Sequence, residues 1–141
     1  MRNVARGVLV VVSILNGIAG LVCGVLFIAG PDGSLMQAGA LLPVIATMPL
    51  ANVFFQDFLW IGIAMLLVLG IPNTVATVLL VRKSASQYRA TLATGILLLL
   101  WTGFELIFMP NGLAIGYFVV GIVVVAASVL LGRTTVQRSA E

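Results

Sequence analysis

Hydrophobic residues fill four long stretches of this 141-residue chain, and short polar segments separate them. A helix that crosses a bilayer needs about 20 apolar residues, and each stretch is long enough. We expect spans at approximately residues 8–29, 58–81, 90–109 and 113–131. The breaks at 30–34, 82–89 and 110–112 contain glycine, proline or charged residues, which are typical of turns. The pattern predicts an all-α integral membrane protein, an antiparallel four-helix bundle that forms a single domain over residues 1–141.

The composition supports a membrane protein and excludes several kinds of metal-binding and catalytic site. Hydrophobic residues make up 62% of the chain and charged residues 8%, whereas soluble domains are about a quarter charged. The chain has no histidine and one cysteine, Cys23, so zinc-finger, haem-attachment and Ser-His-Asp arrangements are excluded. We expect no metal, no cofactor and no catalytic residue. The first segment also resembles a signal peptide, but its apolar run is long, and we interpret it as a retained span.

The basic residues predict the orientation in the membrane. They precede the first span, lie between the second and third, and follow the fourth: Arg2, Arg6, Arg82, Lys83, Arg89, Arg133 and Arg138. Lys and Arg concentrate in cytoplasmic loops, so we expect both termini to be cytoplasmic in a multi-pass protein of the plasma (inner) membrane. The lipid bilayer then accounts for the positive charge, and nucleic acid is not an expected partner.

The connection between the first two spans is apolar but broken by prolines. Residues 34–52 carry no charge and contain Pro43 and Pro49. We expect short helical segments at the interface or a partly re-entrant loop, lying against the outer face of the bundle.

Small and polar residues indicate how the helices pack. Ser13, Gly17, Gly20 and Gly24 are spaced four, three and four residues apart, which places them on one helix face. This glycine seam lets another helix approach closely, within the bundle or in a homodimer. Pro72 predicts a kink in the second span. Asn16 and Asn73 lie at similar depth, and we expect a hydrogen bond between their helices, with ligand contact as the alternative.

Glu105 is the acid that stands inside an apolar span. An ionised carboxylate is costly in hydrocarbon, so we expect it to face the bundle interior. No Lys or Arg lies on the outer half, which favours a protonated acid or a cationic ligand over an ion pair. The ligand-binding residues that we expect to share an outward-opening site with it are Asp57, Tyr117, Trp101, Trp60 and Thr102. Alternatively, these contacts are structural: Asp57 caps the second span, and Trp60 is an interfacial aromatic residue.

Several short motifs resemble those of a family of small bacterial four-span membrane proteins. The matching positions are Pro31–Ser34 (P-D-G-S), Met48–Leu50 (M-P-L), Phe55, Asp57 and Phe58 (F-x-D-F), Leu69 and Gly70, and Trp101 with Glu105. The resemblance implies the four-span architecture and supplies no activity. At the level of architecture alone, the chain is also similar to DoxX-like proteins. Small multidrug transporters share the size, the four spans and a membrane glutamate, although their glutamate is in the first span.

Three functional hypotheses follow, from different classes. The first is a non-enzymatic binding or accessory protein that holds a lipophilic or amphipathic molecule, or a membrane protein partner, in its outer half. The alternative is a small proton-coupled exporter of lipophilic cations that uses Glu105. The third is a membrane enzyme acting on a lipid or quinone, with Asp57 and Glu105 as an acid/base pair.

Overall fold

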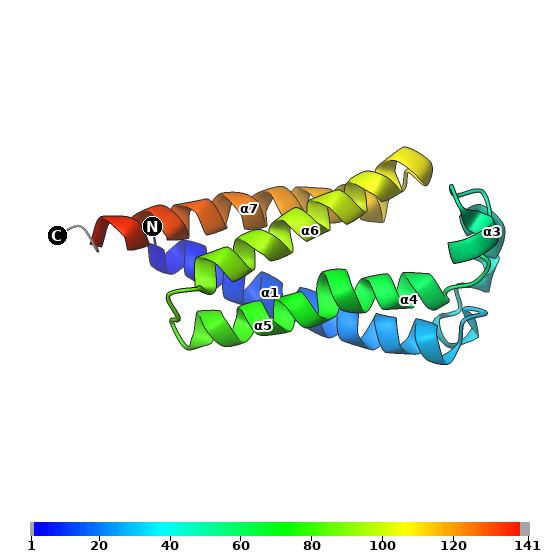
Figure 1. Cartoon of the computed structure of the whole chain (residues 1–141), viewed down its shortest axis with the longest axis horizontal. Helices are drawn as coiled ribbons and strands as arrows, with labels where there is room; N and C mark the ends of the chain where they lie inside the picture. Colours follow the sequence, from blue (N-terminus) through cyan, green and yellow to red (C-terminus); the bar gives the residue numbers. More distant parts are fainter. Residues whose placement is uncertain (1, 139–141) are drawn as a thin grey trace.

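Four long apolar helices dominate the structure, a computed structural model that describes the backbone of residues 2–138 and the side chains of residues 3–132. Each is long enough to cross a membrane, and no strand occurs in the described part of the chain. They are α1 (Arg2–Ala29), the continuous run of α4 (Leu59–Met65), η3 (Leu66–Gly70) and α5 (Ile71–Val81), then α6 (Gln87–Phe108) and α7 (Gly112–Arg138). The start of α1, the α5–α6 turn and the end of α7 lie at one end of the molecule (Figure 1).

The helices follow the predicted spans closely and extend beyond them at the polar end. α1 begins at Arg2 rather than near residue 8, and α6 begins at Gln87 rather than near residue 90. The run of apolar residues indicates only the part of a helix that can lie in hydrocarbon. The helix itself continues into the polar residues on either side, because its backbone hydrogen bonds do not require apolar side chains. The α6–α7 turn agrees with the prediction, because Asn111 Oδ1 accepts a hydrogen bond from the backbone N–H of Ala114 at 2.8 Å and caps α7.

A π-helical turn lies just before Pro72, where the sequence predicted a kink, and the kink itself stays a prediction. This turn is the segment η3, and the N–H of Ile71 donates to the carbonyl of Leu66, five residues earlier. A wider turn relieves the clash of a proline ring with the preceding carbonyls. Side chains supply further donors, from Asn73 Nδ2 to Leu69 O at 2.9 Å and from Thr74 Oγ1 to Gly70 O at 2.8 Å.

The glycine seam of α1 packs against this irregular span. A Cβ atom at Gly20 would lie 2.3 Å from the backbone nitrogen of Gly70, and one at Gly24 would lie 3.0 Å from the carbonyl oxygen of Gly62. A Cβ at Gly17 would lie 3.3 Å from Thr74 Oγ1. The seam therefore brings two backbones together within one chain, and Ser13 is buried at its N-terminal end.

The segment between α1 and α4, called the outer loop for the orientation expected from the sequence, consists of short helical segments, as the prolines suggested. They are η1 (Ser34–Met36), η2 (Gly39–Leu41), α2 (Leu42–Ile45) and α3 (Ala51–Phe54). Ile45 is buried in a cluster with Phe27 and Phe58, whose rings stack at 4.8 Å. The loop thus covers the outer ends of α1 and α4 by apolar contact.

A separate apolar core fills the end that carries the basic residues. Its buried members come from α1, α5 and α7: Ala5, Leu9, Leu80, Val124, Ala127 and Leu131. Arg6 ties the same helices together, because its guanidinium donates two hydrogen bonds to the carbonyl of Leu80 near the end of α5. A cation at a helix C-terminus also interacts favourably with the helix dipole.

Candidate functional site

Glu105 lies on the inward-facing side of α6. The buried residues Thr91, Thr94, Leu98 and Thr102 recur along α6 at intervals of three or four, and Glu105 follows Thr102 by three. That spacing keeps all five on one face of a helix. Glu105 is half-buried at the C-terminal end of this stripe.

Among the described side chains, no basic group lies near the Glu105 carboxylate, and its polar neighbour is aromatic. The indole of Trp101, one turn earlier, is the polar side chain that interacts with it. Arg89, the basic residue on α6, stands about 24 Å away along the helix at 1.5 Å per residue. The other basic side chains of the described part, Arg6, Arg82 and Lys83, belong to the α1 start and the α5–α6 turn at that far end (Figure 1).

An aromatic cluster next to Glu105 connects α6 to the outer loop. The ring of Phe104 lies 6.2 Å from Trp101 and 4.9 Å from Phe108. The ring of Phe55, just after α3, lies 6.3 Å from Phe104. Sequence reasoning missed Phe55, Phe104 and Phe108. The spacing of Trp101, Phe104 and Phe108 on one helix face was an available signal, but the partner Phe55 is distant in sequence.

Thr102 and Asp57 have local hydrogen bonds. Thr102 is buried and donates its hydroxyl hydrogen to Leu98 O at 2.7 Å within α6. Asp57 Oδ1 accepts a hydrogen bond from the backbone N–H of Leu59 at 2.9 Å, at the start of α4. The N-cap of α4 is Phe58, so this bond closes a turn just before the helix, and the capping role that the structural alternative gave to Asp57 stays a prediction.

Trp60 and Tyr117 are not joined to Glu105 by an observed contact. Trp60 is 43% exposed, and its ring packs edge-on against Phe54 at 5.1 Å. Tyr117 is half-buried on α7. Among the described side chains, Glu105 and Trp101 therefore form the part of the expected site that the structure brings together, and a common site with Asp57, Trp60 and Tyr117 stays a prediction.

The buried hydroxyl groups on α6 and α7 donate within their own helices. Thr91 bonds to Gln87 O, Thr94 to Thr91 O, and Ser128 to Val124 O, at 2.7 to 3.0 Å. Asn16 and Asn73 are both buried, and the observed bond of the Asn73 amide goes to Leu69 in its own helix. A hydrogen bond between these two asparagines stays a prediction.

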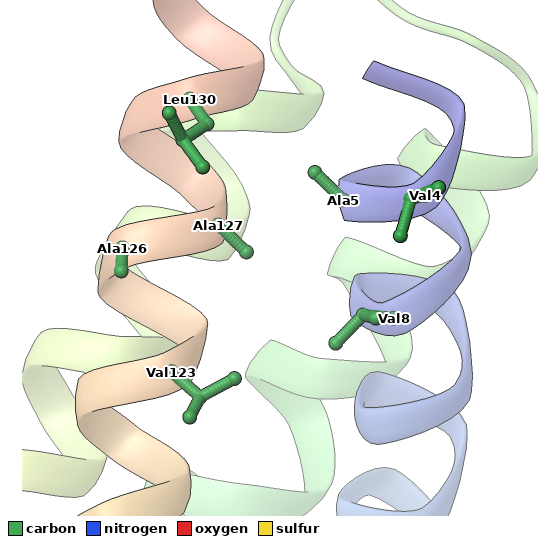
Figure 2. A pocket seen from close by; sticks show the side chains of 7 residues that line it. All are labelled: Val4, Ala5, Val8, Val123, Ala126, Ala127 and Leu130. Atoms are coloured by element: carbon green, nitrogen blue, oxygen red, sulfur yellow. The ribbon is translucent and has the colours of Figure 1, made fainter. Parts of the chain in front are cut away.

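Two surface grooves lie away from Glu105. One, of 460 Å³, runs between α1 and α7 (Figure 2), and the other, of 250 Å³, follows Ser13, Gly17, Thr74 and Thr77 along α1 and α5.

Within the described residues, no group of three or more Cys, Asp or Glu side chains is arranged to hold a metal ion. Comparison of the chain with protein-family models, curated proteins and solved structures gave no match.

Proposed function

We propose that the four apolar helices form an antiparallel bundle in the plasma (bacterial inner) membrane, with both termini cytoplasmic. The distribution of charge supports this orientation. Arg6, Arg82, Lys83 and Arg89 gather at the end where α1 begins, and Asp32, Asp57 and Glu105 stand in or near the opposite turns. Lys and Arg favour the cytoplasmic side of a membrane protein, so the Glu105 end would face outward.

Within this arrangement, we propose a non-enzymatic binding protein that holds a lipophilic or amphipathic molecule at the outer end of α6. The observation that carries this proposal is the position of Glu105 on the inward-facing stripe, beside aromatic rings and far from any described basic group. A carboxyl group in that setting is costly unless a proton or another molecule satisfies it. A ligand with a cationic or hydrogen-bonding group and an apolar body would satisfy both the acid and the rings of Trp101 and Phe104.

The packing of the inner half favours binding over transport. Leu9, Leu80, Val124 and Leu131 fill that half with apolar side chains, and the buried hydroxyls of Thr91 and Ser128 donate within their own helices. These side chains offer a polar molecule little compensation for lost water. A ligand would therefore reach Glu105 from the outer end and leave the same way.

A proton-coupled exporter of lipophilic cations is the second candidate. The π-helical turn η3 favours it, because such turns occur at functional sites and allow a helix to change register. Enzymatic action on a lipid or quinone comes third. The proposed acid/base pair would need Asp57, whose Oδ1 is engaged with the N–H of Leu59.

The test compares molecules that copurify with the wild-type chain and with Glu105→Gln. Both proteins are purified in a mild detergent and extracted, and the bound small molecules are measured by mass spectrometry. We expect the wild type to carry a lipophilic molecule with an amine or hydrogen-bonding group. Glu105→Gln should lose most of it and should unfold at an unchanged temperature, since the amide keeps the size of the acid.

Asp32→Asn is the matched control, because it removes another acid near the outer end that is exposed and distant from α6 in sequence. That variant should retain the ligand. Full retention by Glu105→Gln would refute the site. Uptake of ethidium into wild-type vesicles along a pH gradient, lost in Glu105→Gln, would replace the binding role with the exporter. A copurified membrane protein without a small molecule would favour the accessory role.

A further inference from the structure

The groove between α1 and α7 is lined by apolar side chains alone. Val4, Ala5 and Val8 of α1 face Val123, Ala126, Ala127 and Leu130 of α7 across 460 Å³ (Figure 2). It lies at the opposite end of the molecule from Glu105, so an occupant here would be separate from the ligand proposed above.

Alanine residues create the hollow. Ala5 and Ala127 form its floor, and both belong to the buried core with Leu9 and Leu131. The exposed side chains of Val4 and Leu130 stand at its edges. Larger residues at the alanine positions would close the space, so the two helices touch at the floor and leave a channel open toward the surface.

Basic residues gather at the end of the molecule that holds this groove. Arg2 is one helical turn before Ala5 on α1, and Arg133 is one turn after Leu130 on α7. Arg82 and Lys83 are exposed in the turn after α5 at the same end of the molecule. Arg6 is fixed there as well, through its bonds to Leu80 O.

We propose that the α1–α7 groove binds one acyl chain of an anionic phospholipid, with the phosphate headgroup at the basic end. An apolar channel offers no hydrogen-bond partner, so a polar ligand would lose more from desolvation than it gained. An acyl chain has no polar group that needs a hydrogen-bond partner, and the headgroup of its lipid would lie at the end of the molecule that carries the basic residues. The juxtaposition of apolar groove and basic end selects an anionic lipid over a neutral one.

Native mass spectrometry of the full chain in mild detergent tests the proposal, with phosphatidylglycerol and phosphatidylcholine of identical acyl chains as probes. We expect wild-type protein to retain one phosphatidylglycerol in preference to phosphatidylcholine. Ala126→Phe should abolish that retention by filling the groove from an exposed position. Ala93→Phe is the matched control, since Ala93 is exposed at a similar depth on α6, and it should retain the lipid as the wild type does.

A second pair of variants tests the headgroup. Arg2→Gln with Arg133→Gln should reduce the preference for phosphatidylglycerol by about fivefold per arginine lost, while the acyl chain still binds. Lys83→Gln should change the preference less. Equal retention of both lipids by the wild type would overturn the proposal, as would unchanged retention by Ala126→Phe. A dimer that Ala126→Phe dissociates would also overturn it, because a second copy would then be the occupant.

Discussion

Asp32 and Asp57 hold the two ends of the outer loop through local hydrogen bonds. Asp32 Oδ1 accepts bonds from the hydroxyl of Ser34 at 2.7 Å and from its backbone N–H at 3.1 Å. The N–H of Phe58, next to Asp57, donates to Pro31 O at 2.8 Å, and this bond joins the two ends. Gly33, with a φ of 77°, packs so closely on Phe58 that a Cβ would lie 2.8 Å from the ring. The P-D-G-S and F-x-D-F motifs therefore form one structural unit.

The first prediction concerns the acidity of Asp32. The hydroxyl of Ser34, followed by its N–H, lowers the pKa of Asp32 from its usual 3.8. Ser34→Ala should raise this pKa toward 3.8, because the largest cause is removed. NMR titration of the Asp32 carboxyl carbon in detergent micelles measures the change. The bonds stabilise the turn above pH 3.8, and that contribution is lost as the pH falls through the lowered pKa of the folded state.

Ser84→Ala provides the control for this titration, since Ser84 lies in the α5–α6 turn at the other end of the molecule. It should leave the pKa of Asp32 unchanged. If Ser34→Ala also left it unchanged, the Asp32–Ser34 hydrogen bond would not be formed in the protein.

The environment of a single residue was predictable where it depends on the free-energy cost of placing that side chain in hydrocarbon and not on how the helices pack. The expectation that Glu105 faces the interior followed from the cost of a carboxylate in hydrocarbon, and Glu105 is half-buried in the structure. A local structural role for Asp57 was foreseen only as an alternative, because a carboxylate near a helix start can cap or bind. The proximity of Phe55 to Phe104 was not foreseen, since the two residues are far apart in the sequence and meet only through the folded arrangement of the helices.

At the scale of elements, α1 packs closely against the second span because both have small residues at the contact and the second span has an irregular turn there. Gly20 meets the backbone of Gly70, the last residue of the π-helical turn η3. The number of long helices and the apolar part of each were readable from apolar length, whereas the extensions of α1, α6 and α7 at the basic end were not. The π-helical form, and the choice of a partner within the chain for the glycine seam, depend on tertiary contacts that no single segment encodes.

The second prediction tests this close approach. Gly20→Ala places a Cβ where Gly70 N is 2.3 Å away, so the helices must separate. We expect the free energy of unfolding to fall by about 1–3 kcal/mol, as for other overpacked sites. Gly116→Ala is the control, because a Cβ there meets nothing within 4 Å. Unfolding in mixed micelles at increasing SDS measures both variants. Equal stability of Gly20→Ala and Gly116→Ala would mean that the seam does not bring the two backbones together.

At the scale of the whole molecule, its two ends differ in chemistry. One end combines basic residues, an apolar core and the α1–α7 groove, and the other combines the helical loop with Glu105 and its aromatic neighbours. The charge asymmetry was visible in the sequence because it depends only on which breaks contain Lys and Arg. The groove was not, because it arises from alanines on helices that are far apart along the chain.

Both proposed sites depend on the same orientation, with the Glu105 end outside the cell and the groove in the cytoplasmic half. Labelling of single cysteines in intact cells tests it most directly, in a Cys23→Ser background that removes the native thiol. A membrane-impermeant maleimide should label Ser34→Cys in the outer loop and should reach Ser84→Cys, in the α5–α6 turn, only after the membrane is opened. Labelling of Ser84→Cys from outside the intact cell, with Ser34→Cys protected, would contradict the orientation and both binding sites with it.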